Sequence, residues 1–307
     1  MSDIVILGIF VADTAYRADR QPKMGETILG TSFALGPGGK GSNQSVAAAM
    51  AGGKTSIITR LGKDAFADIA RATWAKAGVQ PAITEDAESY TGAAYIFLEN
   101  ATGNNAIIVA AGAAGRISVE DVEASRPLIE GAKVFITQLE QPIPAAKRAL
   151  EIARAAGVRT ILNPAPAAPL GDDILALCDF VTPNESETES LTGLPVTTIA
   201  EAEKAADALL ARGVGACIIT LGERGALYRD RERSVHVPVI TAGKVLDTTG
   251  AGDAFNGGFA VALTEGRDVV DAVRFGCATA GISVTRAGTA PAMPSRAEID
   301  ALLAAQR

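Results

Sequence analysis

Histidine is nearly absent from this chain of 307 residues, in which His236 is the only one. A single imidazole cannot form a histidine-rich metal site, and a Ser-His-Asp triad is disfavoured because His236 lies in a charged, strand-like hairpin. Cysteine is scarce too: Cys178, Cys217 and Cys277 are far apart, show no CxxC spacing and cannot all pair. We therefore expect buried free thiols.

Long apolar runs and basic clusters are missing as well. No apolar stretch approaches the roughly eighteen residues that a transmembrane helix needs, and Met1–Asp3 lacks the positive charge that opens a secretory signal peptide. The net charge of −7, the pI near 5.0 and the lack of a Lys/Arg cluster argue against nucleic acids and anionic membranes as partners. We expect a cytoplasmic protein that holds any anionic ligand with backbone dipoles and ions.

Apolar residues make up 48% of the chain, and they fall into strand-like runs that alternate with helical periodicity. Strands are expected at 4–10, 55–60, 133–139, 159–162, 180–182 and 216–221, and helices at 43–51, 65–77, 145–156 and 199–212. This alternation predicts an α/β fold in which helices cover both faces of a mostly parallel sheet. Because no internal repeat or linker interrupts the chain, residues 1–307 are expected to form one domain.

Two segments break this alternation. Residues 13–34 and 91–110 look extended, without intervening helices, and the second contains a turn at 100–104. They are expected to form a small sheet that stands off the main one as a lid. From Gly252 onward the chain is predicted to be nearly all helix, with Ser295 as the N-cap of a last helix at 296–305.

The run from 245 to 259, VLDTTGAGDAFNGGF, is the most informative part of the sequence. Gly250, Ala251 and Gly252 let backbone N–H groups approach an anion closely, and the helix start adds unpaired N–H groups and a positive dipole end. Asp253 would repel a resting phosphate, so its expected use is to accept the proton of a hydroxyl that attacks the phosphate. The alternative is that Asp253 only caps the helix.

A second glycine-rich stretch lies at 36–44. Gly36, Gly38 and Gly41 satisfy G-x-G-x-x-G, but a dinucleotide fingerprint should follow the first strand directly, and this stretch lies well beyond it. The stretch is better interpreted as the opening of a helix whose N–H groups, with Lys40 and Asn43, hydrogen-bond a polyhydroxyl compound. A purely structural glycine turn is the alternative.

Short motifs along the chain are more specific in their order and spacing than any one of them alone. They are VADTAY at 11–16, GET at 25–27, GGKGSNQ at 38–44, QLEQP at 138–142, NPAPA at 163–167, TPNESE at 182–187, TLGERG at 220–225 and DTTGAGDAFNGG at 247–258. Together they resemble the ribokinase family of sugar kinases, the PfkB carbohydrate kinases, over essentially the whole chain. The resemblance implies a three-layer α/β/α fold with a mostly parallel central sheet and a small β-sheet lid.

The resemblance also implies roles for individual residues. Asp253 looks like the general base that takes the proton of a sugar's primary hydroxyl, with Gly250, Ala251 and Gly252 as the anion hole for the γ-phosphoryl group. The positions that match the sugar pocket are Val11, Asp13, Gly39, Lys40, Gly41, Asn43 and Glu140, besides Asp253 itself. The positions that match the ATP site are Asn184, Thr220, Gly222, Gly225, Gly252 and Cys277.

Metal ions are implied at two places. Glu187 matches an acidic residue linked to Mg²⁺ and phosphate, although Asn184 and Glu187 could also be no more than a helix capping box. A K⁺ or similar monovalent cation, held largely by main-chain carbonyls, is implied at Asp247, Thr249, Ser283, Arg286 and Gly288. Such an ion would stiffen the anion-hole loop, whereas the alternative for Asp247 is a turn residue that caps its own backbone.

Three positions depart from the family pattern. Val11 stands where many ribokinases have Asn, which removes one donor or acceptor from the sugar pocket. Ala292 stands where a Ser side chain often completes the cation site, so that site is expected to be weaker or completed by water. Cys277 lies near the adenine at a position that can carry His, and a thiol there acts as a small hydrophobe.

The implied activity is that of an ATP-dependent sugar kinase acting on the primary hydroxyl of a pentose, with D-ribose to D-ribose 5-phosphate as the leading reaction. A nucleoside, deoxyribose or keto-sugar kinase is an alternative, and a non-catalytic sugar or nucleotide sensor is an alternative of another class. Closure of the lid over the sugar would exclude water. A homodimer through the lid is also implied, with contacts at Ile28, Phe33, Tyr95 and Phe97 unless these pack on their own chain.

Overall fold

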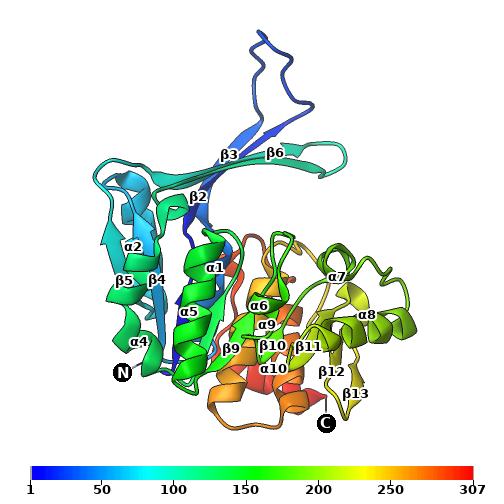
Figure 1. The fold of residues 1–307 in the computed structure, drawn as a ribbon. Helices are drawn as coiled ribbons and strands as arrows, with labels where there is room; N and C mark the ends of the chain where they lie inside the picture. The colour runs from blue at the N-terminus through cyan, green and yellow to red at the C-terminus, as the bar shows by residue number, and fades with distance from the viewer. Residues whose placement is uncertain (1, 307) are drawn as a thin grey trace.

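The computed structural model describes residues 2–306 and contains a large β-sheet with helices on both faces and a small β-sheet above it (Figure 1). The large sheet has nine strands in the order β13-β12-β11-β10-β9-β8-β1-β4-β5. Neighbours from β5 to β11 are parallel, and only β12 and β13 join antiparallel. The strands are β1 (Ile4–Leu7), β4 (Thr55–Leu61), β5 (Gln80–Glu85), β8 (Val134–Thr137), β9 (Arg159–Leu162), β10 (Phe180–Val181), β11 (Ala216–Thr220), β12 (Ala226–Arg229) and β13 (Ser234–Val237).

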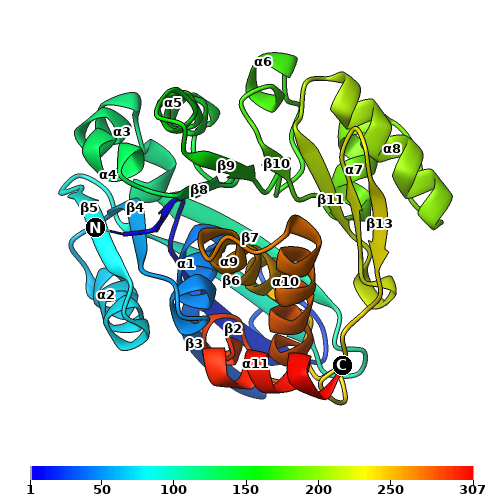
Figure 2. The ribbon, with the colours of Figure 1, turned by 90° about the horizontal axis from the view of Figure 1, so that it is seen from below.

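Helices cover both faces of this sheet, as the alternating pattern predicts (Figure 2). One face carries α3 (Val119–Ala124), α4 (Arg126–Glu130), α5 (Ile143–Ala155), α6 (Asp172–Leu175), α7 (Glu185–Thr192) and α8 (Ile199–Ala211). The other carries α1 (Lys40–Met50), α2 (Ala65–Ala77), α9 (Ala251–Thr264), α10 (Val269–Ser283) and α11 (Arg296–Ala305). Short 3₁₀ turns lie at η1 (Ala113–Arg116), η2 (Gly222–Arg224) and η3 (Ala290–Ala292). The three-layer α/β/α prediction is confirmed.

The small sheet, here called the lid sheet, is built from the two segments predicted to be extended. It consists of β2 (Val11–Ala18), β3 (Ser32–Gly38), β6 (Thr91–Glu99) and β7 (Asn105–Gly112), in the order β3-β2-β6-β7. Strand β2 pairs antiparallel with β3 and parallel with β6, and β6 pairs antiparallel with β7. The lid sheet arches over the main sheet, and the connection between β2 and β3 projects furthest from the body (Figure 1).

Several element boundaries differ from those expected. The first strand ends at Leu7 rather than at residue 10, because the chain leaves the main sheet at Gly8 and enters the lid sheet at Val11. Helix α1 begins at Lys40, three positions before the expected start at Asn43, because its polar first turn is held inside the fold. The edge strand β5 and the short helices α3, α4 and α6 were not expected, whereas the start of α7 matches the alternative of a helix capping box at Asn184 and Glu187.

The last helix begins as predicted. Ser295 and Glu298 form a reciprocal capping box at the start of α11. All three cysteines are free and buried, as expected. Among the helices that the structure describes, none combines the length and the apolar character needed to cross a membrane.

Candidate active site

The start of α9 lies at the centre of the candidate site. Gly250 is its N-cap, with a φ of 78°, a left-handed conformation that glycine adopts without strain. The first N–H groups of a helix have no acceptor within the helix. Here the N–H of Ala251 donates to the carbonyl oxygen of Thr248 at 3.2 Å, while those of Gly250 and Gly252 have no acceptor among residues 2–306. A Cβ atom added to Gly252 would meet nothing within 4 Å, so the space beside this backbone is open. The segment from Gly250 to Gly252 therefore offers a place for an anion.

Asp253 lies in the first turn of α9, with 6% of its surface exposed. Its Oδ2 accepts a hydrogen bond from Nδ2 of Asn43 at 3.0 Å, and its Oδ1 accepts one from Nε2 of Gln44 at 3.0 Å. Both donors belong to α1, and no side chain caps α9. The alternative that Asp253 serves only as a helix cap is therefore wrong, because its carboxylate is held by another helix.

The residues predicted for the sugar side meet where the lid sheet joins α1. A Cβ atom on Gly38 would lie 2.3 Å from either carboxylate oxygen of Asp13, so this carboxylate rests directly against the end of β3. The carboxylate of Glu140 is close by, because its Oε2 accepts the backbone N–H of Lys40 at 2.7 Å. The first turn of α1 is therefore bordered by two carboxylates, which suits a vicinal diol because each can accept from neighbouring hydroxyls.

Two glycines in this region are required by close packing. Gly39 has a φ of 88°, and a Cβ atom on it would lie 2.6 Å from the carbonyl oxygen of Ile9. A Cβ atom on Gly41 would lie 2.6 Å from Cα of Gly8. Helix α1 can therefore start almost in contact with the backbone that follows β1. Gly39 and Gly41 position the sugar-side residues through this packing.

Lys40 is the cation among the carboxylates of the site. Burial disfavours its charge, but attraction to Asp253, Glu140 and Glu187 leaves the pKa of Lys40 above its ordinary value. Burial raises the pKa of Asp13 to about 6. Burial also raises the pKa of Glu140 to about 7, although the charge and the backbone N–H of Lys40 pull this pKa down. Both carboxyl groups, Asp13 and Glu140, therefore gain or lose a proton near neutral pH.

The same balance acts on two further acids of the site. Burial raises the pKa of Asp253, while the charge of Lys40 and the hydrogen bonds from Gln44 and Asn43 lower it. Burial likewise raises the pKa of Glu187, and Lys40 opposes this rise. Perturbed acids gathered around one cation are typical of functional sites.

Asn43 keeps one polar atom free for a ligand. The residue is 4% exposed, and its Nδ2 is used by Asp253. Its Oδ1 is buried and has no hydrogen-bond partner among residues 2–306. An unpaired buried acceptor is costly, and a ligand hydroxyl would satisfy it.

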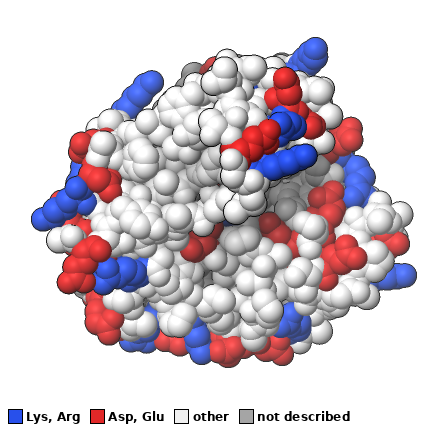
Figure 3. Space-filling view, turned by 90° about the horizontal axis from the view of Figure 1, so that it is seen from above, with Lys and Arg blue, Asp and Glu red and all other residues white. Residues whose placement is uncertain are grey.

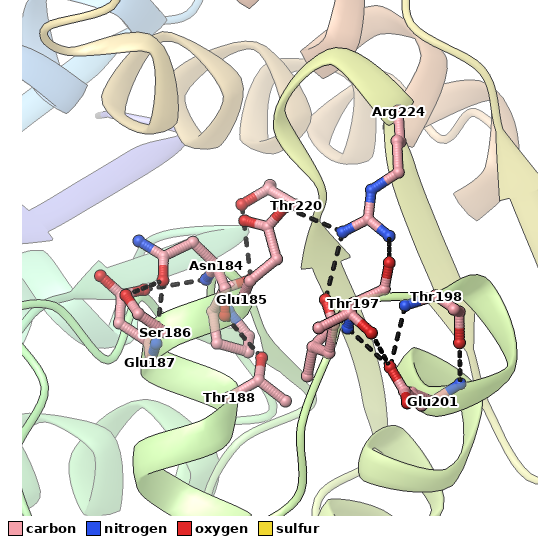
Figure 4. A network of polar contacts seen from close by, with 12 residues as sticks. Asn184, Glu185, Ser186, Glu187, Thr188, Thr197, Thr198, Glu201, Thr220 and Arg224 are labelled. Carbon is pink, nitrogen blue, oxygen red and sulfur yellow. Dashed lines mark hydrogen bonds and ion pairs between the residues drawn. The ribbon is translucent and has the colours of Figure 1, made fainter.

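Four of the six residues predicted for the nucleotide side, Asn184, Thr220, Gly222 and Gly225, lie at the ends of β10 and β11 (Figure 4), whereas Gly252 and Cys277 belong to α9 and α10. Asn184 caps α7: its Oδ1 accepts the N–H of Glu187 at 2.9 Å, and Oε2 of Glu187 accepts the N–H of Asn184 at 2.9 Å. The backbone of Asn184 forms an isolated parallel bridge with Thr220. Gly222, the first residue of η2, and Gly225, its C-cap, both have positive φ, and the space beside Gly222 is open. These predicted residues are brought together.

The capping box found at Asn184 and Glu187 does not prevent a role for Glu187 toward Mg²⁺. Within residues 2–306, no three His, Cys, Asp or Glu side chains cluster closely enough to hold a metal by themselves. Mg²⁺ commonly keeps several waters and binds one or two carboxylates plus substrate phosphates. Glu187 fits such a site because its carboxylate shares the electrostatic neighbourhood of Lys40 and Asp253.

The residues predicted for a monovalent cation also converge. Oδ1 of Asp247 accepts the N–H of Thr249 at 2.9 Å, and its Oδ2 accepts the N–H of Gly288 at 3.0 Å. The N–H of Asp247 donates to Val284 at 3.2 Å, beside Ser283 at the end of α10. The alternative that Asp247 caps a local turn is thus present in the structure. Because these bonds use the carboxylate of Asp247, the backbone carbonyl groups of the same loops can still face an ion.

Three predicted residues contribute through packing or pair elsewhere. The guanidinium of Arg286 pairs with Glu298 on α11, so only its backbone is left for the loop. Val11 is 4% exposed and belongs to a core cluster, although it shares a face of β2 with Asp13. The thiol of Cys277 is buried in the core between the main sheet, α9 and α10, where it acts as a small hydrophobe.

Sequence reasoning did not assign a role to Gln44, Gln138 or Thr289. Gln44 holds Asp253, and Gln138 holds Gln44. Oγ1 of Thr289 donates to the carbonyl of Pro37 at 2.8 Å, which joins the anion loop region to the lid sheet. The two glutamines stand inside the motifs GGKGSNQ and QLEQP, so their presence was visible. Their contacts were not, because they join residues 94 or more positions apart.

Comparisons with known proteins identify the family of the chain. The family model described as pfkB family carbohydrate kinase matches residues 1–296. The chain is similar to a ribokinase from Haemophilus influenzae, at 37% identity over 296 residues and 96% of each chain. It is equally similar to a deoxyribokinase from Salmonella typhi, at 37% identity over 295 residues, covering 95% of this chain and 96% of the relative.

Solved structures give the same picture. The ribokinase of Arabidopsis thaliana, solved with ribose and ATP, superposes with a TM-score of 0.92 at 31% identity over 98% of each chain. A ribokinase from Thermotoga maritima superposes with a TM-score of 0.89 at 34% identity, covering 99% of this chain and 100% of that one. The motifs, the fold and the whole-length match together place this chain in the pfkB family of carbohydrate kinases.

Proposed function

We propose that this protein transfers the γ-phosphoryl group of ATP to the primary hydroxyl of a pentose, with D-ribose as the leading substrate. The observation that carries the proposal is the position of Asp253. This buried carboxylate lies at a helix start that can receive an anion, and it is held by α1, whose first turn is bordered by Asp13 and Glu140. A sensor that only binds ligands has no need of a base at this position.

The residues would divide the work of phosphoryl transfer. Asp13 and Glu140 accept hydrogen bonds from neighbouring sugar hydroxyls, and Oδ1 of Asn43 is a further acceptor. Asp253 takes the proton of the primary hydroxyl as its oxygen bonds to the γ-phosphorus and the bond to the ADP oxygen breaks. The N–H groups of Gly250 and Gly252 stabilise the negative charge on the phosphoryl oxygens in flight, and that of Ala251 joins them once it leaves the carbonyl oxygen of Thr248.

Metal ions would assist from the nucleotide side. When bound, Mg²⁺ neutralises charge on the phosphates of ATP, and Glu187 is the residue of this chain that we expect to hold it through water or directly. The loops at Asp247 and Gly288 would hold a monovalent cation such as K⁺ with carbonyl oxygens and stiffen the anion hole. Ala292 offers no side-chain oxygen to complete this second site.

A second substrate has a specific observation in its favour. Val11 lies on the face of β2 that also carries Asp13, and its side chain offers no hydrogen bond to a sugar hydroxyl. One of the relatives at 37% identity is named a deoxyribokinase. We therefore propose 2-deoxy-D-ribose as the substrate to compare directly with ribose, since a pocket with an apolar wall tolerates a missing hydroxyl.

We also propose that the chain acts in the cytoplasm as one domain that forms a homodimer through its lid sheet. The face seen from above has broad uncharged areas, with acidic side chains near its middle, a cluster of both signs beside it and further charges around its edge (Figure 3). Large apolar side chains of the lid sheet are exposed, including Phe33 at 58% and Ile108 at 68%. Phe97 is instead 8% exposed, so it packs inside its own chain and is not a dimer contact.

The proposal is tested by coupled ADP release with ribose, 2-deoxyribose, a keto-sugar and a nucleoside, each with and without K⁺. We expect turnover with ribose or deoxyribose that increases with K⁺. In Asp253→Asn, kcat should fall roughly 10²–10⁴-fold while the affinity for ATP stays within about twofold. Binding of sugar and ATP without turnover on any acceptor would identify a sensor and end the kinase proposal. Light scattering during size exclusion separates a dimer from a monomer.

A further inference from the structure

The catalytic carboxylate is held by a chain of buried amide side chains that extends away from the sugar pocket. Nε2 of Gln44 donates to Oδ1 of Asp253 at 3.0 Å and also to Oδ1 of Asn163 at 3.1 Å. Both hydrogens of this amide group are therefore used. Oε1 of Gln44 accepts Nε2 of Gln138 at 2.6 Å. Gln44 and Gln138 are 0% exposed, and Asn163 is 6% exposed.

The chain is anchored on the edge of the main sheet. Gln138 follows β8, Asn163 follows β9 and Thr182 follows β10, and these are adjacent parallel strands. Nδ2 of Asn163 donates to the carbonyl oxygen of Thr182 at 3.1 Å, which turns its Oδ1 toward Gln44. The rigid carboxyl ends of the sheet thus fix the direction of each amide.

The hydrogen bonds leave only one orientation for Gln44. If its amide group turned over, its oxygen would face the carboxylate of Asp253 and Oδ1 of Asn163, and its nitrogen would face the donor Nε2 of Gln138. Each of these contacts would be repulsive. Gln138 reaches this place because Gly8 has no side chain: a Cβ atom there would lie 2.4 Å from Oε1 of Gln138.

We propose that Gln44 and Gln138 are positioning residues for the reaction, and that Gln138 acts on the base Asp253 only through Gln44. This inference rests on the proposed role of Asp253 as the base. The amide donor keeps one oxygen of the carboxylate occupied and directs the carboxylate toward the incoming hydroxyl. It also stabilises the ionised form, which is the form that can accept a proton.

Other charges also act on Asp253, and the test leaves them unchanged. They are Lys40 on α1, Glu140 after β8 and Glu187 on α7, with Asp13 on β2 acting on Glu140. A substitution of either glutamine by methionine keeps the side-chain length and removes only amide groups. A change in the pH profile of such a variant therefore reports the lost donor.

The experiment measures kcat for ribose against pH in Gln44→Met, Gln138→Met and the double variant. In Gln44→Met we expect the acid limb of kcat to move up by about one pH unit, with the KM for ATP changed less than about twofold. Gln138→Met should move the limb in the same direction by a smaller amount, because Gln44 stays but can turn. The double variant should equal Gln44→Met, since Gln138 has nothing left to orient.

Gln141 provides the matched control. It is 3% exposed, and its Nε2 donates to Oγ1 of Thr137 and to the carbonyl oxygen of Gln138, each at 2.6 Å. Gln141→Met therefore removes a buried amide that has no bond to Gln44. We expect its pH limb to coincide with that of the unmodified enzyme, even if its melting temperature falls.

Two results would overturn the inference. The first is an acid limb of kcat that stays unchanged in Gln44→Met. The second is a double variant whose acid limb moves further than in Gln44→Met by the full shift that Gln138→Met causes alone. If Gln44→Met does not fold, Gln138→Met alone decides the question, because it leaves Gln44 in place. An unmodified enzyme that turns over no sugar would instead refute the proposed function, so the two failures are distinguishable.

Discussion

Replacement of Lys40 by methionine should make the catalytic activity of the enzyme depend strongly on pH. Lys40 lowers the pKa of Glu140, Glu187 and Asp253, and each of these carboxyls is otherwise pushed upward by burial. Loss of an adjacent opposite charge raises a carboxyl pKa by about one to three units. Glu140, whose pKa is about 7, would then shift to about 8 or higher.

The expected loss of activity follows from the ionised fractions. At pH 7, a rise from a pKa of about 7 to one of about 8 lowers the ionised fraction of Glu140 from about one half to about one tenth. Because Asp253 must be ionised as well and is affected in the same direction, kcat/KM for ribose at pH 7 should fall about tenfold or more. The loss should shrink toward pH 9, where the carboxyls ionise again.

Kinetics from pH 6 to 9 test this expectation, with Lys40→Arg as the control that keeps the charge. The ratio of kcat/KM between Lys40→Met and the unmodified enzyme should rise with pH, whereas the ratio for Lys40→Arg should stay flat. A constant ratio for Lys40→Met would refute the reasoning, because it would mean that Lys40 acts only through direct contact with a ligand.

Stability should change in the direction set by proton binding. A carboxyl whose pKa is raised in the folded state holds its proton there while the unfolded chain has lost it. The free energy of unfolding therefore falls as pH rises from the unfolded pKa to the folded pKa. Since Lys40→Met raises these folded pKa values further, its deficit in urea unfolding should be larger at pH 9 than at pH 6. An equal loss in the free energy of unfolding at both pH values would contradict the conclusion that Lys40 lowers the pKa of these carboxyls.

Three further substitutions test contacts around the site. Thr289→Val removes the hydroxyl that donates to the carbonyl oxygen of Pro37, so the KM for sugar should rise about two- to tenfold. Thr289→Ser keeps the hydroxyl and should have the steady-state kinetics of the unmodified enzyme. The same KM for sugar in both variants would exclude a role for this hydrogen bond. Gly250→Ala places a Cβ atom at a φ of 78°, where the strain costs about 1–2 kcal/mol, and kcat should fall more than the melting temperature suggests. Trp74→Phe leaves Oγ of Ser42 without its donor, which lies at 3.0 Å, and should cost about 1–3 kcal/mol in urea unfolding without changing either KM; an altered KM would show that this contact reaches the site.

The order of strands and helices was predictable because most elements carry their own pattern. The fully buried runs at β1 and β8 could be recognised as central parallel strands. Strand β5 escaped prediction because its exposed, polar edge sequence contains Pro81 and follows α2 almost directly. Helix α1 was placed too late because its first turn is polar, and only the assembled site explains why Ser42 and Asn43 are buried.

The candidate site could be predicted as a list of residues, but its connections could not. The loop before Asp253 has a local signature, since glycine spacing and a helix start follow from sequence alone. The partners of Asp253 come from α1, about 210 positions away, so their donors are set by how α1 packs on α9. Gln138 and Asn163 likewise become neighbours only when β8 and β9 pair.

The way the chain enters and leaves the lid sheet joins the lid to the predicted sugar side of the site. Strand β2 begins at Val11, shortly after β1 ends at Leu7, and β3 ends at Gly38, next to the start of α1 at Lys40. Asp13 therefore lies within a lid strand, while Lys40 and Asn43 follow the other lid strand after the single residue Gly39. If these residues bind the sugar as we propose, the lid cannot be exchanged as a module without rebuilding the pocket. A chimera that takes β2 and β3 from a relative would inherit the relative's choice of sugar along with its lid.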